Sequence, residues 1–191
     1  MDARKLIVSF GAAVLLLGAC GGSSDGTATD TVQATASAGF DDDDVMFAQM
    51  MIPHHEQAIE LSDIALDPTV GASEDVRRLA TAIKAAQDPE IAEMKALLSG
   101  WGESTEMDPD MDHSEMMDGM LTTGELESLS QLRGAAFDRA WMESMIKHHE
   151  GAVSMAQDVL ADGVNTDMRA LATAIESAQK GEIAEMRALL G

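Results

Sequence analysis

"FAQMMIPHHEQAIELSDIAL" at residues 47–66 and "WMESMIKHHEGAVSMAQDVL" at residues 141–160 are two copies of one segment. A second repeated pair follows, "RRLATAIKAAQDPEIAEMKALL" at 77–98 and "RALATAIESAQKGEIAEMRALL" at 169–190. The stretches that join them, "DPTVGASEDV" and "ADGVNTDM", contain the Pro, Gly and Asn that are typical of loops. The chain therefore contains one segment–turn–segment unit written twice.

All four repeated segments are predicted to be helices. Ala, Leu, Met, Glu, Gln and Lys dominate them, and these residues favour helix. The last segment has an apolar stripe at three-to-five spacing, and Ser73 is placed to cap the second segment. We predict an all-α fold, a four-helix bundle built from two repeated helix–turn–helix units, with a short extra helix at 122–134. The residues of the stripe are Leu171, Ile175, Ala178, Ile183, Met186 and Leu190.

The linker at 99–122 leaves two bundle topologies open. Fully extended, it reaches about 80 Å, whereas a helix of about 25 residues is only about 37 Å long. If it crosses the bundle, the first and third long helices run antiparallel and a two-fold axis relates the repeats. If it loops out, both units begin at the same end.

The N-terminus predicts export and lipid anchoring. Residues 1–20, "MDARKLIVSFGAAVLLLGAC", have a charged start and an apolar run too short to span a bilayer, as in a signal peptide. "LGAC" at 17–20 is similar to a bacterial lipobox, whose cysteine is acylated. Cys20 is the only cysteine, so an intramolecular disulfide is excluded, and the alternative to lipidation is an unpaired reactive thiol. We expect an anchor on the outer face of the bacterial cell membrane.

Composition divides the rest of the chain and limits its partners. Residues 21–42 are rich in Gly, Ser, Thr, Ala and Asp, which predicts a disordered stalk, and residues 43–191 suit one domain. The net charge of −22 excludes nucleic acid as a partner, because phosphate binding needs clustered Lys and Arg. The acidic surface serves solubility or, alternatively, concentrates cations.

Four of the five histidines form two His-His pairs, at 54–55 and 148–149. If the helices span about 43–66 and 134–161, each pair lies near a helix midpoint, and a two-fold axis would bring both pairs to one level. Buried histidines need a partner, and a metal ion is one such partner. The alternative is half-exposed or hydrogen-bonded core histidines.

Helical spacing surrounds these pairs with further candidate groups. Met51 lies one turn before His54 and His55, and the second helix of the unit folds back beside them. The predicted metal ligands are His54, His55, His148, His149, Met51, Met145, Glu90 and Glu182, where the two glutamates either ligate or orient the histidines. Groups predicted to surround the ligands are Asp44, Asp138, Gln87 and Gln179. Imidazole suits copper, zinc, iron or nickel, and thioether selects Cu(I), so the residues favour a soft metal ion and leave its identity open between these metals.

The linker predicts a second, softer site. Its methionines lie in an acidic stretch that has no evident core to fill, unlike Met94, Met155 and Met186, which are predicted core residues. The alternatives are a docking surface and a sacrificial target for oxidation. The residues of this predicted loop site are Met107, Met111, His113, Met116, Met117 and Met120.

The motif D-x-x-[FW]-x-x-x-M-I-x-H-H-x-x-A, followed by Q-x-x-E-I-x-x-M, resembles the DUF305 family of bacterial secreted proteins and lipoproteins. Both copies carry it, from Asp44 to Met94 and from Asp138 to Met186. The resemblance implies a ferritin-like four-helix bundle and extracytoplasmic copper binding. The matching positions are Asp44, Met51, His54, His55, Gln87, Glu90 and Met94, and Asp138, Met145, His148, His149, Gln179, Glu182 and Met186.

We expect a membrane-anchored, non-enzymatic copper chaperone or sequestration protein that supports copper tolerance. One alternative is a ferritin-type di-metal oxidase, which requires Glu-x-x-His motifs. The positions three residues before the paired histidines are Met51, Ile52, Met145 and Ile146, so the required carboxylates are missing. The other alternative is a structural or partner-binding lipoprotein without metal.

Overall fold

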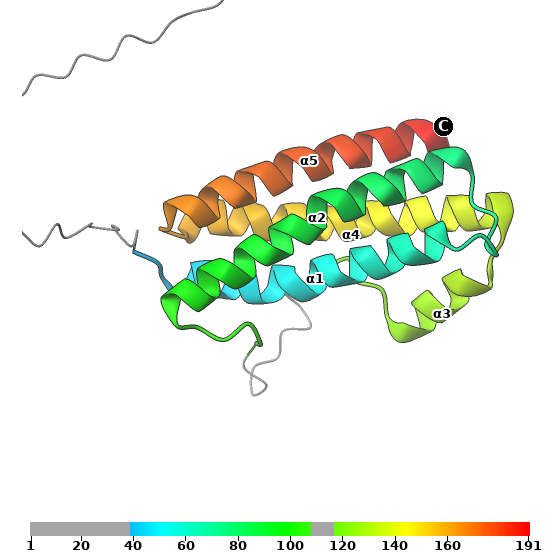
Figure 1. The fold of residues 1–191 in the computed structure, drawn as a ribbon. Coiled ribbons are helices and arrows are strands. Elements are labelled where there is room, and N and C mark those ends of the chain that lie inside the picture. The colour runs from blue at the N-terminus through cyan, green and yellow to red at the C-terminus, as the bar shows by residue number, and fades with distance from the viewer. Residues whose placement is uncertain (1–38, 108–116) are drawn as a thin grey trace, which may run out of the picture. The chain divides into compact units, whose positions relative to one another are not determined.

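The structure is a computed structural model that describes residues 39–107 and 117–191. It confirms the all-α bundle, and the described residues contain no strand. The predicted signal peptide with Cys20, and the stalk up to residue 38, lie outside the described residues. The helices are α1 (Asp42–Leu66), α2 (Glu74–Trp101), α3 (Thr123–Gln131), α4 (Gly134–Asp162) and α5 (Thr166–Leu190) (Figure 1).

The folded domain begins before the predicted boundary at residue 43. The Phe40 ring stacks on Trp101 with ring centroids 4.7 Å apart, and the Asp41 side chain accepts from the Asp44 amide in a capping box. Asn165 Nδ2 donates to the Gly39 carbonyl over 3.2 Å. The prediction of a disordered stalk up to residue 42 is therefore wrong for residues 39–42, because an aromatic stack and a helix cap hold them to the bundle.

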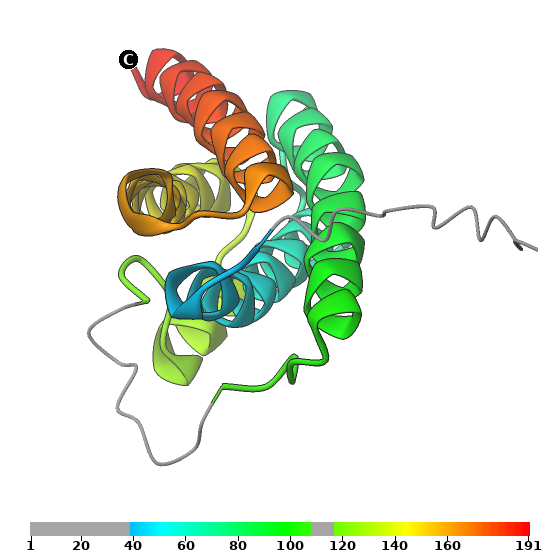
Figure 2. The same ribbon diagram turned by 90° about the vertical axis from the view of Figure 1, so that its left-hand side faces the viewer.

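The linker crosses the bundle, so α1 and α4 run antiparallel (Figure 1). The Gly134 amide, at the start of α4, donates to the Val70 carbonyl beyond the end of α1, over 2.8 Å. α1 pairs with α2 and α4 with α5, and Figure 2 looks nearly along the helices and shows these two pairs side by side. Of the two topologies that the linker length allowed, the structure has the crossing one.

Reciprocal contacts confirm that an approximate two-fold axis relates the repeats. Asp44 accepts from the Asn165 amide over 2.9 Å, and its counterpart Asp138 accepts from the Ser73 amide over 3.1 Å. Ser73 and Asn165 are themselves equivalent, since each caps the second helix of its unit. Each aspartate therefore ties its helix to the turn of the other unit.

A polar layer divides the core into two apolar clusters. Among the buried apolar residues of α1, those up to Ile52 belong to one cluster and those from Ala58 onward to the other, and in α4 the division falls between Ile146 and Ala152. The paired histidines lie at both divisions. The predicted core methionines Met94, Met155 and Met186 are buried, as expected.

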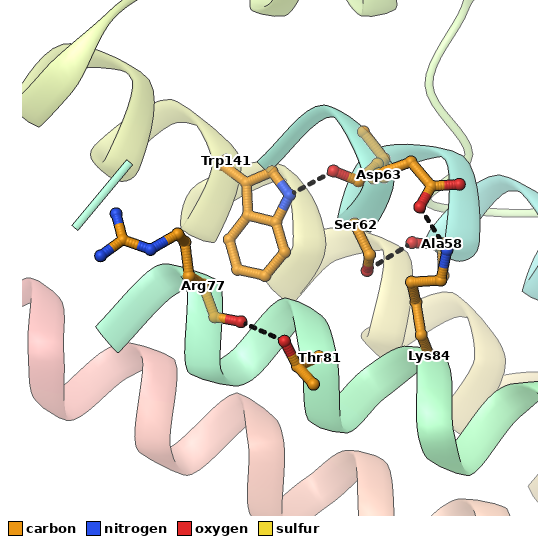
Figure 3. A network of polar contacts seen from close by, with 8 residues as sticks. Ala58, Ser62, Asp63, Arg77, Thr81, Lys84 and Trp141 are labelled. Carbon is orange, nitrogen blue, oxygen red and sulfur yellow. Dashed lines mark hydrogen bonds and ion pairs between the residues drawn. The ribbon is translucent and has the colours of Figure 1, made fainter. Parts of the chain in front are cut away.

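Polar side chains within the apolar clusters form hydrogen bonds with nearby backbone carbonyls. The Trp141 indole donates to the Leu61 carbonyl over 2.9 Å, and Ser62 Oγ donates to the carbonyl of Ala58 over 2.8 Å (Figure 3). Lys84 and Asp63 form an ion pair nearby. These regions are ordinary bundle core, so the unusual polar chemistry is confined to the central layer. No helix in the described residues is long and apolar enough to cross a membrane.

Candidate metal site

All four paired histidines are fully buried at the middle of the bundle. The rings of His54 and His148 come from antiparallel helices and lie with centroids 3.8 Å apart at an angle of 42°. His148 and His149 have centroids 6.2 Å apart. The predicted convergence of the two pairs at one level is confirmed, because the two-fold axis brings the two helix midpoints together.

The outer histidines are held by glutamates from the second helix of each unit. His55 Nε2 lies 3.0 Å from Glu90 Oε2, and His149 Nε2 lies 2.8 Å from Glu182 Oε2. A carboxylate only accepts, so each Nε2 carries a proton, and Nδ1 is the ring nitrogen left to bind another group. Both Nδ1 atoms are buried without a hydrogen-bond partner. A carboxylate that orients an imidazole in this way is the usual support of a metal-binding histidine.

The inner histidines have still fewer partners. His54 Nε2 lies 3.3 Å from the carbonyl of Asp118, which leaves Nδ1 unpartnered, and neither ring nitrogen of His148 has a hydrogen-bond partner. Burial lowers the pKa of His54 to about 3. Burial, with the neighbouring His54 and His149, holds the pKa of His148 well below its usual range. Both rings are therefore neutral at pH 7, and the neutral ring is the form that binds metal.

Two glutamines complete the layer. Gln87 of α2 lies between Ile83 and Ile91, which belong to different apolar clusters, and Gln179 is placed in the same way in α5. Their amide atoms are buried and unpartnered. In the described residues, every buried side-chain nitrogen or oxygen without a hydrogen-bond partner belongs to this layer of four histidines and two glutamines, except Oδ1 of Asp44. Native proteins have a few such groups per 100 residues, and what is unusual here is that nearly all of them lie in one layer.

The layer offers nitrogen and amide oxygen donors more than carboxylates, and the nearest thioethers along α1 and α4 belong to the adjoining apolar clusters. Met51 and Met145, one turn before His55 and His149, are fully buried. In residues 39–107 and 117–191, no group of three or more His, Cys, Asp and Glu side chains is placed to hold one metal ion. A metal ion in this layer would therefore take ligands of mixed type, and the soft thioethers favour Cu(I) among them.

Asp44 and Asp138 do not surround the histidines, and this part of the prediction is wrong. Asp44 accepts from the amides of Val164 and Asn165, and Asp138 accepts from Ser73. Helical spacing places each aspartate on the histidine face but three turns away, at the end of the bundle. There the carboxylate binds the turn of the other unit.

A short segment of the linker, residues 118–121, covers the inner histidine pair, and we call it the strap. Gln57 donates to the Leu121 carbonyl and accepts from the Leu121 amide, both over 2.8 Å. A Cβ added to Gly151 would lie 1.7 Å from the Asp118 carbonyl oxygen, so only glycine permits this approach. Gln57 and Gly151 were not predicted site residues, although they occupy equivalent positions in the two repeats, where the sequence differs.

The predicted linker methionines lie in different surroundings and do not form one site in the described residues. Met107 and Met117 are partly buried and pack against the core, so the premise that they have no core to fill is wrong for these two. Met120 lines a groove of about 360 Å³ beside α3 and α4. Gln49, whose side chain donates to the Ser104 carbonyl over 2.8 Å, helps to fold the linker back. Met111, His113 and Met116 lie outside the described residues.

Together, the duplicated helical hairpins and the buried histidine layer define a four-helix bundle with a candidate metal centre at its middle. The family model "Domain of unknown function (DUF305)" matches residues 44–190, and the chain belongs to this family. No protein of curated function matches the chain.

Solved structures share the fold. A DUF305 protein from Streptomyces coelicolor, described as secreted, is 31% identical with a TM-score of 0.71, over 78% of this chain and 91% of that one. A DUF305 fragment from Deinococcus radiodurans is 33% identical with a TM-score of 0.71, over 80% of this chain and 97% of that one. CopM in its Cu(II)-bound form is 30% identical with a TM-score of 0.64, over 76% of this chain and 94% of that one. CopM has also been solved in Cu(I)-bound, Ag-bound and apo forms.

Proposed function

We propose that this chain is an extracytoplasmic copper-binding protein, anchored to the membrane through Cys20, that sequesters copper or passes it on. The observation that carries the proposal is the layer of four buried histidines with unpartnered ring nitrogens. Leaving such groups unsatisfied costs about 1–3 kcal/mol each, so a fold that keeps them in duplicate needs a bound partner to offset the cost.

Copper is favoured by the donor set and by a relative. Buried imidazoles and thioethers together suit copper, and burial holds the inner histidines His54 and His148 neutral. CopM, a structural relative, has Cu(I)- and Cu(II)-bound forms. The secreted relative from Streptomyces coelicolor supports a location outside the cytoplasm.

Binding without catalysis is favoured over a di-metal oxidase. In the described layer only Glu90 and Glu182 bring carboxylates, and both are engaged with histidine Nε2 atoms. Ferritin-type chemistry uses carboxylates from all four helices. A partner-binding lipoprotein without metal would leave the unpartnered atoms of the layer without a role.

The test is a competitive titration of the purified full-length chain with Cu(I), Cu(II), Zn(II) and Fe(II). A variant with His54, His55, His148 and His149 changed to alanine and a variant with Met111, His113 and Met116 changed to alanine run beside it. We expect tight copper binding that the first variant loses and the second keeps. Copper binding lost only in the second variant would move the site to the linker, and no copper binding by the wild type would overturn the proposal.

The anchor is tested separately. A Cys20→Ser variant expressed in a lipoprotein-processing bacterium should leave the membrane fraction and appear as soluble protein. A variant that stays in the membrane fraction to the same extent as the wild type would contradict anchoring through Cys20.

A further inference from the structure

A hollow of about 240 Å³ opens between the first turns of α1 and the last turns of α4. Thioethers and carboxylates line it together. Met50 and Met155 are nearly fully buried, whereas Asp43 belongs to the acidic first turn of α1. The lining groups that matter here are Met46, Met50, Met155, Asp43, Asp158 and Asp162.

The charge in this hollow is uncompensated. Asp43, Asp158 and Asp162 form no ion pair in the described residues, and no Lys or Arg is among the residues that line the hollow. Burial raises the pKa of Asp43, and repulsion from Asp41 and Asp162 raises it further. Asp158 and Asp162 are exposed and Asp43 is partly exposed. A cluster of one sign of charge around a concave surface attracts cations.

The hollow adjoins the histidine layer. Asp118 and Gly151 form part of its wall, and the Asp118 carbonyl lies 3.3 Å from His54 Nε2. A Cβ placed on Gly151 would come within 3.4 Å of that same nitrogen. The fully buried His54 therefore lies directly behind this part of the wall, and the unpartnered His148 packs against its ring.

The repeat shows that the fold does not require these side chains. In the other unit, the positions of Met46 and Met50 are occupied by Ala140 and Ser144. The equivalents of Met155 and Asp158 are Leu61 and Ile64, and the equivalent of Asp43 is Phe137, all at the opposite end of the same two-fold bundle. Both ends fold, but the groove beside Ala140 and Ser144 has one methionine, one glutamate and a lysine, whereas the hollow has three methionines and four aspartates and no Lys or Arg among its lining residues.

We propose that this hollow is the capture site through which a soft metal cation enters the histidine layer. The carboxylates attract the cation, the thioethers hold it, and displacement of the Asp118 carbonyl passes it to His54 and His148. The inference rests on the proposed function, and it assigns loading to one end of a bundle whose histidines are symmetric.

The test measures the rate of Ag(I) loading by stopped flow in the full-length chain, with Ag(I) as a soft, redox-inert probe. All variants, and the parent protein with which they are compared, carry Met111, His113 and Met116 changed to alanine, which removes the predicted linker ligands that lie outside the described residues. Met46→Ala with Met50→Ser installs the side chains of the other repeat, and Met142→Leu is its control, because Met142 is a buried thioether outside the hollow. Asp43→Asn with Asp158→Asn is isosteric, and Glu60→Gln with Glu127→Gln removes the same charge from exposed positions elsewhere.

We expect both hollow variants to load on the order of 10-fold more slowly than the linker-substituted parent, with final affinity kept, while both controls load at the parent's rate. If Glu60→Gln with Glu127→Gln slowed Ag(I) loading equally, the net charge of the protein would explain the slower loading, and the proposed capture site would be overturned. Unchanged rates in both hollow variants would overturn it while leaving the proposed function intact. If Ag(I) binding persists after the four histidines become alanine and is lost with Met46→Ala and Met50→Ser, the hollow binds the cation and the histidine function fails.

Discussion

The rings of His54 and His148 lie with centroids 3.8 Å apart across the interface of two antiparallel helices, and neither side chain is exposed. Two neutral imidazoles pack at this distance without a hydrogen bond between them, although the pair retains three unpartnered ring nitrogens, His54 Nδ1 and both nitrogens of His148. Burial of these unpartnered atoms lowers the stability of the metal-free fold.

Replacing the pair by apolar side chains should separate stability from metal binding. We expect His54→Leu with His148→Leu to unfold, without metal, at the wild-type temperature or above, because the change removes unsatisfied buried polar atoms. Copper at about 100 times its Kd should stabilise the wild type by about 2.7 kcal/mol and the variant far less. Thermal unfolding with and without copper measures both effects. Equal stabilisation of both proteins by copper would count against a site at this pair.

The metal-free protein should lose stability in mild acid. Folded His54 has its pKa lowered to about 3, so below pH 6.5 the unfolded chain binds a proton at this residue and the folded chain does not. The unfolding free energy therefore decreases as the pH is lowered. Between pH 7 and pH 5, His54 alone should cost about 2 kcal/mol, and His148, whose pKa is also lowered, should add to it.

Urea unfolding in the presence of a chelator, at several pH values, measures this slope. The variant with leucine at both positions should have a flatter profile, because it lacks the two histidines whose pKa is lowered. It is a suitable control, because its other carboxylates and histidines are those of the wild type. Identical slopes in the two proteins would show that the acid response comes from elsewhere in the chain.

Gly151 should be intolerant of even one methyl group. In Gly151→Ala the new Cβ would meet the Asp118 carbonyl, so the strap must shift and the His54 contact is lost. We expect a loss of about 1–3 kcal/mol in unfolding free energy. We also expect faster hydrogen exchange at the Leu121 amide, which donates to Gln57 when the strap is in place.

Gly181 in α5 is the matched control, since a Cβ there meets nothing within 4 Å. Gly181→Ala should stabilise the protein by about 0.5–1 kcal/mol through helix propensity. If both alanine variants were equally stable, the close approach of the strap would have no energetic weight.

The glutamates should tune affinity without being required for folding. We expect Glu90→Gln to weaken copper binding by about 10–100-fold, because the amide orients His55 less firmly and makes it a weaker donor. Glu182→Gln should act in the same way on His149, whereas the exposed Glu93→Gln on α2 should change nothing. Competition titration gives the three affinities, and a Glu93 effect as large as that of Glu90 would point to charge alone.

Much of the architecture was determined by the sequence alone, because its signals are local. Helix-forming composition, an apolar stripe and the Ser73 cap predicted the helices, and Ser73 Oγ does accept from the Val76 amide over 3.3 Å. The repeat placed His54 and His148 at helix midpoints, and a two-fold arrangement then brings them to one level whatever the details of packing. The glutamate partners Glu90 and Glu182 followed from folding each hairpin back on itself.

The tertiary structure alone decided the relations between residues that are far apart in the chain. Linker length allowed both topologies, and only packing of α1 on α4 shows that it crosses. Helical periodicity gives the face of a residue but not what lies opposite, so Asp44 and Asp138 were assigned to the histidines when they bind the other unit's turn. The strap was hidden for the same reason, since its contact with Gly151 depends on the distance between two backbones, which no pattern of side chains records.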